Sequence, residues 1–293
     1  MIEVVYNSNG LIKNTTLDKY NSADLTWINV FNPKEEDLSL ISKKFGISIS
    51  TLKHFLDNDE IPRIEKLKDH DIIILKFLVE KKVRTLGIVK GKNYVLTSCI
   101  ENINIDIDKE VISKDSSYLL KFILNKLIRN FSLKLDSIEE EISHLEDIIF
   151  DEKKDKDNKE IYHLKKELIY IKKGLNSNKD VISEIEKIDD IKIELNQLIE
   201  VENTLSYRIT EIMYLYMTYT SNKLNETMKS FTVIASLILL PSLIAGIYGM
   251  NLKIPLSDIN GSFYIILGVM LFFMILMILY FKYEKWVWKH RQQ

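Results

Sequence analysis

A charge-free stretch near the C-terminal end constrains this chain of 293 residues more than any other feature. Residues 231–248 read FTVIASLILLPSLIAGIY and contain no Asp, Glu, Lys or Arg. A helix of about 17 to 25 apolar residues crosses the ~30 Å hydrocarbon core of a bilayer, so this stretch is long enough to span a membrane. A second charge-free run follows at residues 263–281. We therefore predict two membrane-spanning helices.

The first of these helices carries its small and polar residues along one line. Steps of three and four residues place uncharged side chains on a shared stripe: Asn225, Met228, Thr232, Ala235, Leu239, Ser242, Gly246 and Gly249. Small residues allow helices to pack closely in lipid, whereas uncharged oxygen donors can line an ion pathway. Spacing alone favours helix packing and leaves the pathway open as the alternative.

Four segments of the chain resemble the CorA family of divalent-cation transporters, which favours the pathway. Residues 27–33 (WINVFNP) and 56–67 (LDNDEIPRIEKL) resemble recurring segments of that family's cytoplasmic domain. Residues 221–228 (SNKLNETM) and 244–251 (IAGIYGMN) resemble the start of its pore helix and its Gly-Met-Asn signature. The four segments occur in family order, which is far more specific than a lone tripeptide.

The resemblance implies a pore and names its residues. In the family the signature asparagine selects the ion and the assembly is a homopentamer, so Asn251 is expected to form a ring of amide oxygens. Mg²⁺ loses its water reluctantly, and an amide ring can hold the hydrated ion by hydrogen bonds. Gly249 leaves room for that ion, and Met250 packs beside it. Further lining residues are expected at Asn225, Met228 (as a gate), Thr232, Leu239 and Ser242, although the Pro241-Ser242 pair departs from the usual family pattern.

Regulation by cytoplasmic metal binding is also implied by the resemblance. In the family, carboxylates between subunits bind the transported ion and close the channel. Counting back from Asn225 places Asp190 at the matching position, with Asp189 beside it, and Glu80 is the expected partner from the N-terminal domain. Acidic residues at a helix start also complement the helix dipole, and that alternative stays open for Asp189 and Asp190.

The expected cargo and regulatory ion is Mg²⁺, with Co²⁺ and Ni²⁺ as further candidates, drawn inward by the membrane potential. One alternative is a ZntB-like zinc transporter; such relatives tend to carry Gly-Ile-Asn, so Met250 argues against it. The other is a membrane-anchored coiled-coil protein without transport. Neither a convergent set of catalytic residues nor a phosphate-binding loop is found, so we expect no enzyme and no nucleotide partner.

The fold class is expected to be α+β, with an N-terminal cytoplasmic α/β domain, a long helical stalk and two C-terminal transmembrane helices. Runs rich in β-branched residues predict strands at residues 2–6, 26–30, 72–79, 85–89 and 94–98. Helices are predicted at residues 33–45, with Asn32 as N-cap, and at residues 48–56. The expected divisions are residues 1–115 (α/β domain), 116–187 (paired long helices at 117–149 and 158–183), 188–251 (stalk continuing into the first span), 252–262 (external loop), 263–281 (second span) and 282–293 (basic cytoplasmic tail).

The stalk carries a seven-residue apolar repeat. Leu198, Leu205, Ile209 and Ile212 follow this repeat, and Glu202 occupies a slot where an apolar residue is expected. The pattern is typical of coiled-coil packing, either between copies of the helix or against the preceding helices. The expectation of a homo-oligomer itself comes from the CorA resemblance.

Basic residues predict how the chain lies in the membrane. Arg208, Lys223 and Lys229 precede the first span, and Lys282 opens a basic tail after the second, whereas the loop between them has only Lys253. Basic residues mark the cytoplasmic side, so both termini are expected in the cytoplasm of a multi-pass protein of the cytoplasmic membrane, with lipid as a partner. The net charge of −2 gives no reason to expect nucleic acid, no signal peptide is expected, and Cys99 is expected to fill a packing position.

Overall fold

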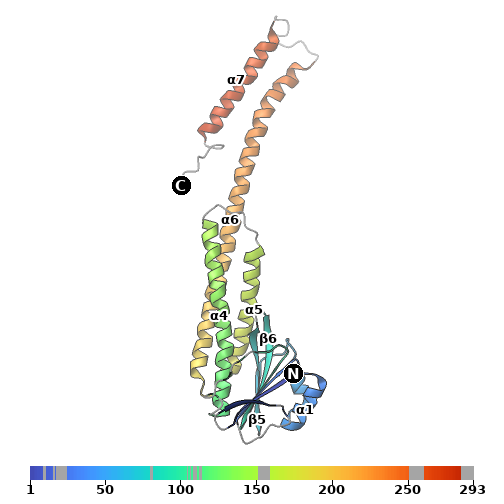
Figure 1. Ribbon diagram of the computed structural model, residues 1–293. Helices are drawn as coiled ribbons and strands as arrows, with labels where there is room; N and C mark the ends of the chain where they lie inside the picture. Colours follow the sequence, from blue (N-terminus) through green and yellow to red (C-terminus); the bar gives the residue numbers. More distant parts are fainter. Residues whose placement is uncertain are drawn as a thin grey trace. The chain divides into compact units, whose positions relative to one another are not determined.

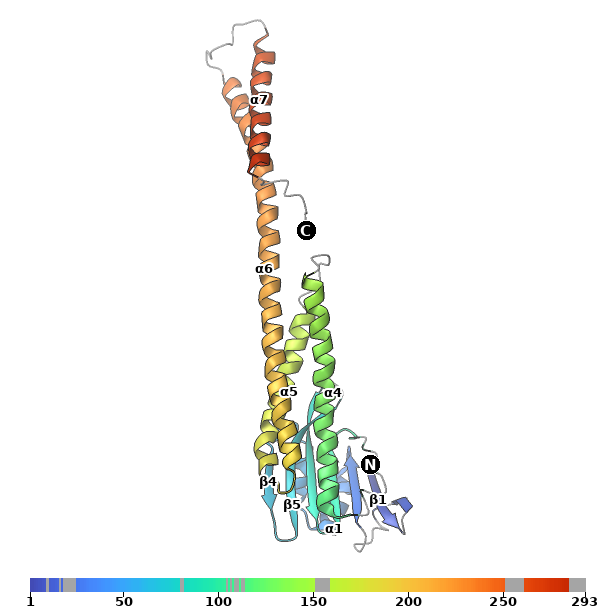
Figure 2. The ribbon, with the colours of Figure 1, turned by 90° about the vertical axis from the view of Figure 1, so that its left-hand side faces the viewer.

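The computed structural model describes residues 1–8, 11–15, 17, 25–79, 82–103, 105, 107, 111, 114–150, 159–250 and 261–284. The chain forms two compact units, Met1–Met213 and Tyr214–Gln293. Helix α6 (Asp189–Tyr248) begins in the first unit and ends in the second. Figures 1 and 2 show both units as ribbons.

The first unit is built on one mixed sheet of seven strands in the order β2-β1-β3-β7-β6-β5-β4. Strands β3 and β7 run parallel, and the other described pairs are antiparallel. The five predicted strands are confirmed, and the two edge strands, β2 and β4, were not predicted. The strands are β1 (Ile2–Ser8), β2 (Leu11–Thr15), β3 (Thr26–Phe31), β4 (Arg63–Lys66), β5 (His70–Val79), β6 (Lys82–Gly91) and β7 (Tyr94–Cys99).

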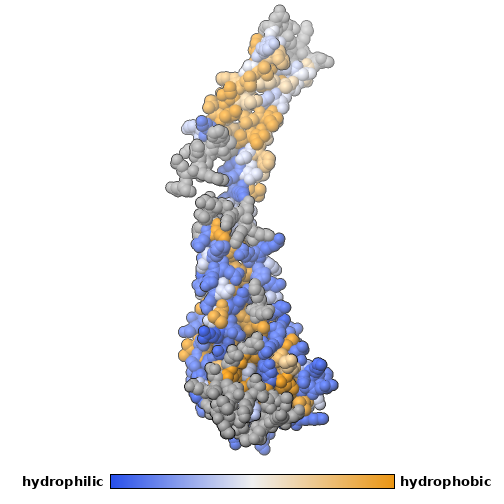
Figure 3. Space-filling view, viewed as in Figure 1, coloured by the Kyte–Doolittle hydropathy of each residue, from blue (hydrophilic) through white to orange (hydrophobic). Residues whose placement is uncertain are grey.

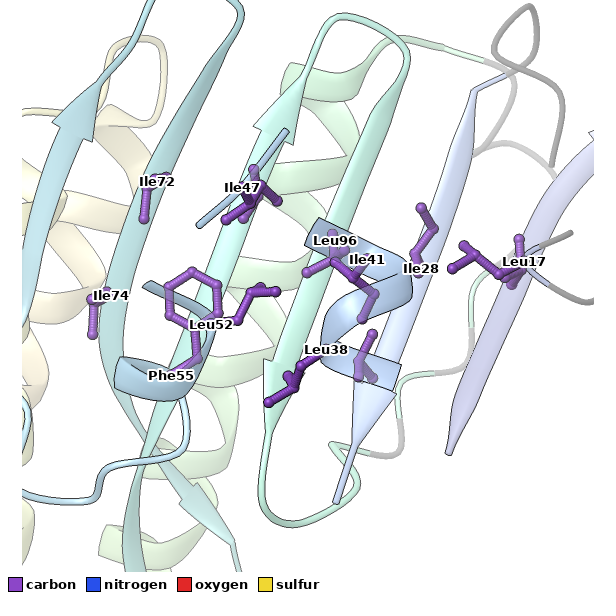
Figure 4. Packing of buried hydrophobic residues seen from close by; sticks show 13 residues of the cluster. Leu17, Ile28, Leu38, Ile41, Ile47, Leu52, Phe55, Ile72, Ile74 and Leu96 are labelled. Carbon is purple, nitrogen blue, oxygen red and sulfur yellow. The ribbon is translucent and has the colours of Figure 1, made fainter. Parts of the chain in front are cut away.

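Two short helices, α1 (Glu35–Phe45) and α2 (Ile49–His54), cover one face of this sheet. Figure 4 shows their apolar side chains, including Leu38, Ile41 and Leu52, above buried residues of the strands. Phe55 lies so close to Gly87 of β6 that a Cβ atom there would sit 1.9 Å from the ring. Since no real Cβ contact is that short, this position of the sheet accepts only glycine without rearrangement.

The start of α1 differs from the prediction. Asn32 was predicted as the N-cap, but it lies outside the helix with φ 43°, in a left-handed conformation that asparagine tolerates. The cap is Lys34, whose backbone N–H donates to Asp37 Oδ2 at 3.0 Å. Because the chain turns at Asn32, the helix begins later, at a position where the Asp37 carboxylate accepts from the free backbone N–H of Lys34.

Helices α4 (Ser116–Phe150) and α5 (Lys159–Ser183) pack on the opposite face of the sheet. Gly174 of α5 lies close to Phe131 of α4 and Val83 of β6, where an added Cβ would be 3.3 Å from both side chains. This glycine lets helix, helix and sheet meet at one point. Both long helices were predicted from the sequence and are confirmed.

Helix α5 also completes the sheet where its edge strand stops. Strand β4 pairs with β5 only as far as Arg63 and Ile74, which leaves the next outward-facing amide and carbonyl of β5, at Lys76, without a strand partner. The side chain of Asn178 takes that place: its Oδ1 accepts from Lys76 N at 2.7 Å and its Nδ2 donates to Lys76 O at 2.6 Å. One buried amide thus substitutes for a strand.

Helix α6 runs beside α4 and α5 in both views of the ribbon (Figures 1 and 2). Its predicted apolar repeat is buried here, since Leu205, Ile209 and Ile212 are each at most 2% exposed. Glu202 is 0% exposed, which confirms that it occupies an apolar slot. The first half of α6 is therefore the third helix of a bundle.

The second unit contains the rest of α6 and helix α7 (Ser262–Tyr283). By length and composition both helices can cross a membrane. Their surface is predominantly apolar, as the orange region of Figure 3 shows, and Val233 and Phe281 are the apolar side chains buried within the described part of this unit. Pro241 lies inside α6, and the helix continues through it to Tyr248.

Candidate ion pathway

The predicted stripe lies on a single uninterrupted helix. Asn225, Met228, Thr232, Leu239 and Ser242 all belong to α6, and successive members are three, four or seven residues apart. Because 3.6 residues make one turn, these side chains share one side of the helix. The geometry therefore agrees with a common lining face.

Exposure within one chain does not distinguish this face from the adjoining residues Phe231 and Ile238. Met228 and Leu239 on the stripe are 56% and 70% exposed, and Phe231 and Ile238 off the stripe are 63% and 61% exposed. All of them are left uncovered by the chain's own described residues. The exposure of these four side chains therefore does not identify a pore face.

The hydroxyl of Thr232, on the stripe, has a defined orientation. Thr232 Oγ1 donates to the carbonyl of Met228 at 2.9 Å, one turn earlier on the same helix. Its only proton is engaged in that bond, so the oxygen offers lone pairs to other donors. The water molecules around a hydrated cation point their O–H groups outward, and Thr232 Oγ1 can accept hydrogen bonds from them.

The chain turns immediately after the helix. Gly249 N–H donates to Ala245 O at 2.9 Å and Met250 N–H donates to Ile247 O at 3.2 Å, closing the last turn. A Cβ atom on Gly249 would be 3.1 Å from Ala245 O, tighter than ordinary contact, which favours glycine at this point. Asn251 and the loop after it lie outside the described residues.

The predicted regulatory carboxylates are engaged by lysines. Asp190 Oδ2 lies 2.8 Å from Lys121 Nζ of α4, and Asp189 Oδ1 lies 3.5 Å from Lys192 Nζ one turn along α6. The hydrogen bond from Lys121 lowers the pKa of Asp190 below its ordinary value. Glu80 lies outside the described residues.

The described residues of one copy do not assemble a metal site. Within the described ranges, no three His, Cys, Asp or Glu side chains are placed to hold an ion together. The partner that sequence reasoning missed is Lys121, which precedes Asp190 by 69 residues and comes from another helix. No local pattern could have found it.

Comparison with known proteins gives a consistent result over nearly the whole chain. The model of the family described as "CorA-like Mg2+ transporter protein" matches residues 22–283. The chain belongs to this family. The CorA resemblance noted in the sequence is therefore confirmed.

Individual CorA relatives agree along their full length. The chain is 31% identical to the cobalt/magnesium transport protein CorA of Methanocaldococcus jannaschii over 95% of this chain and 97% of that protein. The complete structure of the CorA magnesium transporter from the same organism matches with a TM-score of 0.80 at 27% identity, covering 96% and 97% of the two chains. Both the mixed sheet with its long helices and the two apolar helices belong to the shared CorA architecture.

A further solved structure matches only the first part of the fold. The cytoplasmic domain of ZntB from Vibrio parahaemolyticus matches with a TM-score of 0.58 at 17% identity, covering 75% of this chain and 97% of that one. At this identity the match establishes the fold alone. The sheet and bundle therefore do not decide between magnesium and zinc as cargo.

Proposed function

We propose that this chain carries Mg²⁺ across the cytoplasmic membrane, with Co²⁺ as a second cargo and Ni²⁺ as a weaker one. The observation that carries this proposal is an uncharged stripe that continues through the charge-free stretch of α6, in a chain that matches the CorA-like family over residues 22–283. Relatives along the full length are cobalt/magnesium transport proteins. Uncharged oxygen atoms can accept hydrogen bonds from the water molecules of an ion that keeps its hydration shell.

Transport would proceed through a ring of identical stripes. Copies of α6 surround an axis, Asn251 holds the hydrated ion at the outer mouth, and Gly249 leaves space while Met250 packs against its neighbours. Thr232, Ser242 and Asn225 accept hydrogen bonds from the waters of the ion along the path. The apolar rings of Met228 and Leu239 close the path by excluding water.

This mechanism requires a homo-oligomer, and we propose a pentamer with both termini in the cytoplasm. Support comes from the second half of α6, where the chain's own described residues leave the whole stripe exposed. An isolated uncharged oxygen facing lipid is unfavourable, so Asn225, Thr232 and Ser242 are better placed around a wet axis. The membrane potential drives a divalent cation inward through such a path.

Regulation by cytoplasmic metal remains part of the proposal, with Asp189, Asp190 and Glu80 as its candidate residues. The described residues of one chain do not form the site, because Lys121 occupies the carboxylate of Asp190. A regulatory ion at Asp190 would have to displace Lys121 from this carboxylate. We derive no gating step through such an ion.

The test is ion uptake into liposomes containing the full-length protein. Asn251→Ala should abolish Mg²⁺ uptake, because the ring that recognises the hydrated ion is lost. Asn196→Ala is the matched control, since Asn196 is an exposed residue of the same helix within the bundle, and it should leave uptake unchanged. Uptake of Zn²⁺ in preference to Mg²⁺ would favour the ZntB-like alternative, and absence of any uptake by the native protein would favour the anchored coiled coil.

A further inference from the structure

A fully buried carboxylate interrupts the apolar seam that holds α6 in its bundle. The seam comprises Ile191, Leu195, Leu198, Leu205, Ile209 and Ile212, all at most 7% exposed, and Glu202 stands in its middle at 0%. Glutamate is rarely buried to this extent without a full set of partners. Glu202 therefore requires a physical account.

The partners of Glu202 come from its own helix and from α5. Ser206 Oγ donates to Glu202 Oε1 at 2.5 Å, and Lys172 Nζ lies 3.5 Å from Oε2. Lys172 Nζ donates in turn to Asn203 Oδ1 at 2.7 Å. Among the described residues, Oε2 of Glu202 accepts no hydrogen bond.

This arrangement costs stability compared with an apolar residue. A buried charge with incomplete hydrogen bonding is often less favourable than a hydrophobic side chain of similar size. The 46% exposure of the Lys172 side chain also weakens the ion pair through solvent screening. The carboxylate is therefore not explained by a contribution to stability.

What a buried polar residue can contribute is a unique pairing. A seam of Leu and Ile repeats every three and four residues, so a shift of α6 by one step, about 5 to 6 Å along its axis, would place one apolar residue where another had been. Glu202 breaks that equivalence, because only one position brings its carboxylate within reach of Lys172. A single polar residue in an apolar seam is known to fix register at the expense of stability.

Two further polar contacts of α6 in the bundle are more exposed. Asp190, which pairs with Lys121, is 58% exposed at the side chain. Arg208 is 26% exposed and reaches Glu146 and Glu139, whose side chains are 31% and 53% exposed. Exposed pairs can re-form with other partners at little cost, whereas Glu202 cannot.

We propose that Glu202, paired with Lys172 of α5, is a positioning residue that selects one seat for α6 in the bundle. Since the lining residues lie on the same uninterrupted helix, a change of this seat is also expected to lower transport. That second consequence rests on the proposed function. The first concerns the bundle alone and can be measured without transport.

The test combines distance measurements with uptake in the full-length protein. Spin labels are attached to cysteines introduced at Tyr170 of α5 and Tyr207 of α6, which are 48% and 64% exposed. The native Cys99 is 0% exposed and stays unlabelled. Labelled copies are mixed with an excess of unlabelled copies, so that within the proposed oligomer the distances measured by electron spin resonance are those between the two helices of one copy. Glu200→Leu is the matched control, because Glu200 is exposed on the same helix.

Glu202→Leu should leave the unfolding temperature equal to or above that of the native chain, while the single distance peak broadens or splits by several ångström. Mg²⁺ uptake should fall in the same variant. A charge-reversed pair, Glu202→Lys with Lys172→Glu, should restore the single peak and part of the uptake. Glu200→Leu should change neither.

An unchanged, single distance peak in Glu202→Leu would overturn the proposal, whatever happens to uptake. A split peak together with an absence of Mg²⁺ uptake by the native protein would instead leave the register role standing and overturn the proposed function. A marked fall in the unfolding temperature of Glu202→Leu would also contradict the proposal, because the carboxylate would then be a stabilising group.

Discussion

The two halves of α6 have similar apolar content and opposite surroundings. In the bundle, Leu205, Ile209 and Ile212 are at most 2% exposed, whereas further along the same helix Ile238 and Leu239 are 61% and 70% exposed. The chain supplies partners for the first half from α4 and α5. For the second half its described residues supply few, and the proposed function assigns the remaining contacts to lipid and to other copies of the chain.

The largest expected effect separates the two halves by cavity formation. Leu205→Ala should lower the free energy of unfolding by about 2–5 kcal/mol, because a filled position becomes a void. Ile238→Ala removes an apolar side chain that faces outward and should have a much smaller effect. Thermal and denaturant unfolding of both variants in detergent micelles provide the measurement. An equally large loss for Ile238→Ala would show that this face packs against protein and not lipid.

The next effect distinguishes the two faces of the second half. In Ser242→Cys the thiol should react with a charged, water-soluble thiol reagent at least about tenfold faster than in Ile238→Cys, because a thiolate forms in water and not in hydrocarbon. The background is silent, since burial raises the pKa of Cys99 to about 12. Labelling followed by mass spectrometry gives the rates. Equal protection of both thiols would favour the helix-packing interpretation of the stripe.

A smaller effect is expected at the contact that Arg208 of α6 makes with α4. Arg208 donates from Nε and Nη2 to the two oxygens of Glu146 at 3.2 and 2.8 Å, and from Nη1 to Glu139 at 3.2 Å. Lysine cannot form this two-point contact, so Arg208→Lys should cost about 1 kcal/mol. Arg129→Lys, on an exposed position of α4, is the control. Equal unfolding free energies for the two variants would contradict a structural role for the contact.

The smallest effect concerns acid. The pKa of Asp190 is lowered in the folded state by Lys121, so this pair stabilises the fold above the ordinary aspartate pKa of about 3.9 and loses its contribution as pH falls through the lowered value. Lys121→Gln should move the pKa of Asp190 upward and make the loss of stability on acidification shallower. Carboxyl titration by NMR checks the first point. A pKa unchanged by the substitution would show that another group lowers it.

The sequence predicted the elements that follow a strong period and missed those that do not. The two spans, the long helices and the buried slot of Glu202 were all visible as patterns of charge and apolar residues. Strand β4 reads RIEK, with three charged residues out of four, and is held by pairing with β5 on one side only. An edge strand needs no apolar alternation, and its sequence therefore gave no sign of it.

The candidate site was predictable only in part for a related reason. The stripe could be placed because all its members lie on one helix, where spacing determines direction. The surroundings of Asp190 could not, because Lys121 comes from a different helix. The roles of Asn251 and Glu80 remain predictions, since both lie outside the described residues.

The side-chain amide of Asn178, in α5, is hydrogen-bonded to Lys76 of β5, and this has a mechanical consequence. If α5 separated from the sheet, the backbone N–H and carbonyl of Lys76 would lose their hydrogen bonds to Asn178. Buried peptide groups without partners are strongly disfavoured. The sheet and α5 should therefore move together as one rigid body. Hydrogen exchange should therefore find the amides of β5 among the slowest to exchange in the protein.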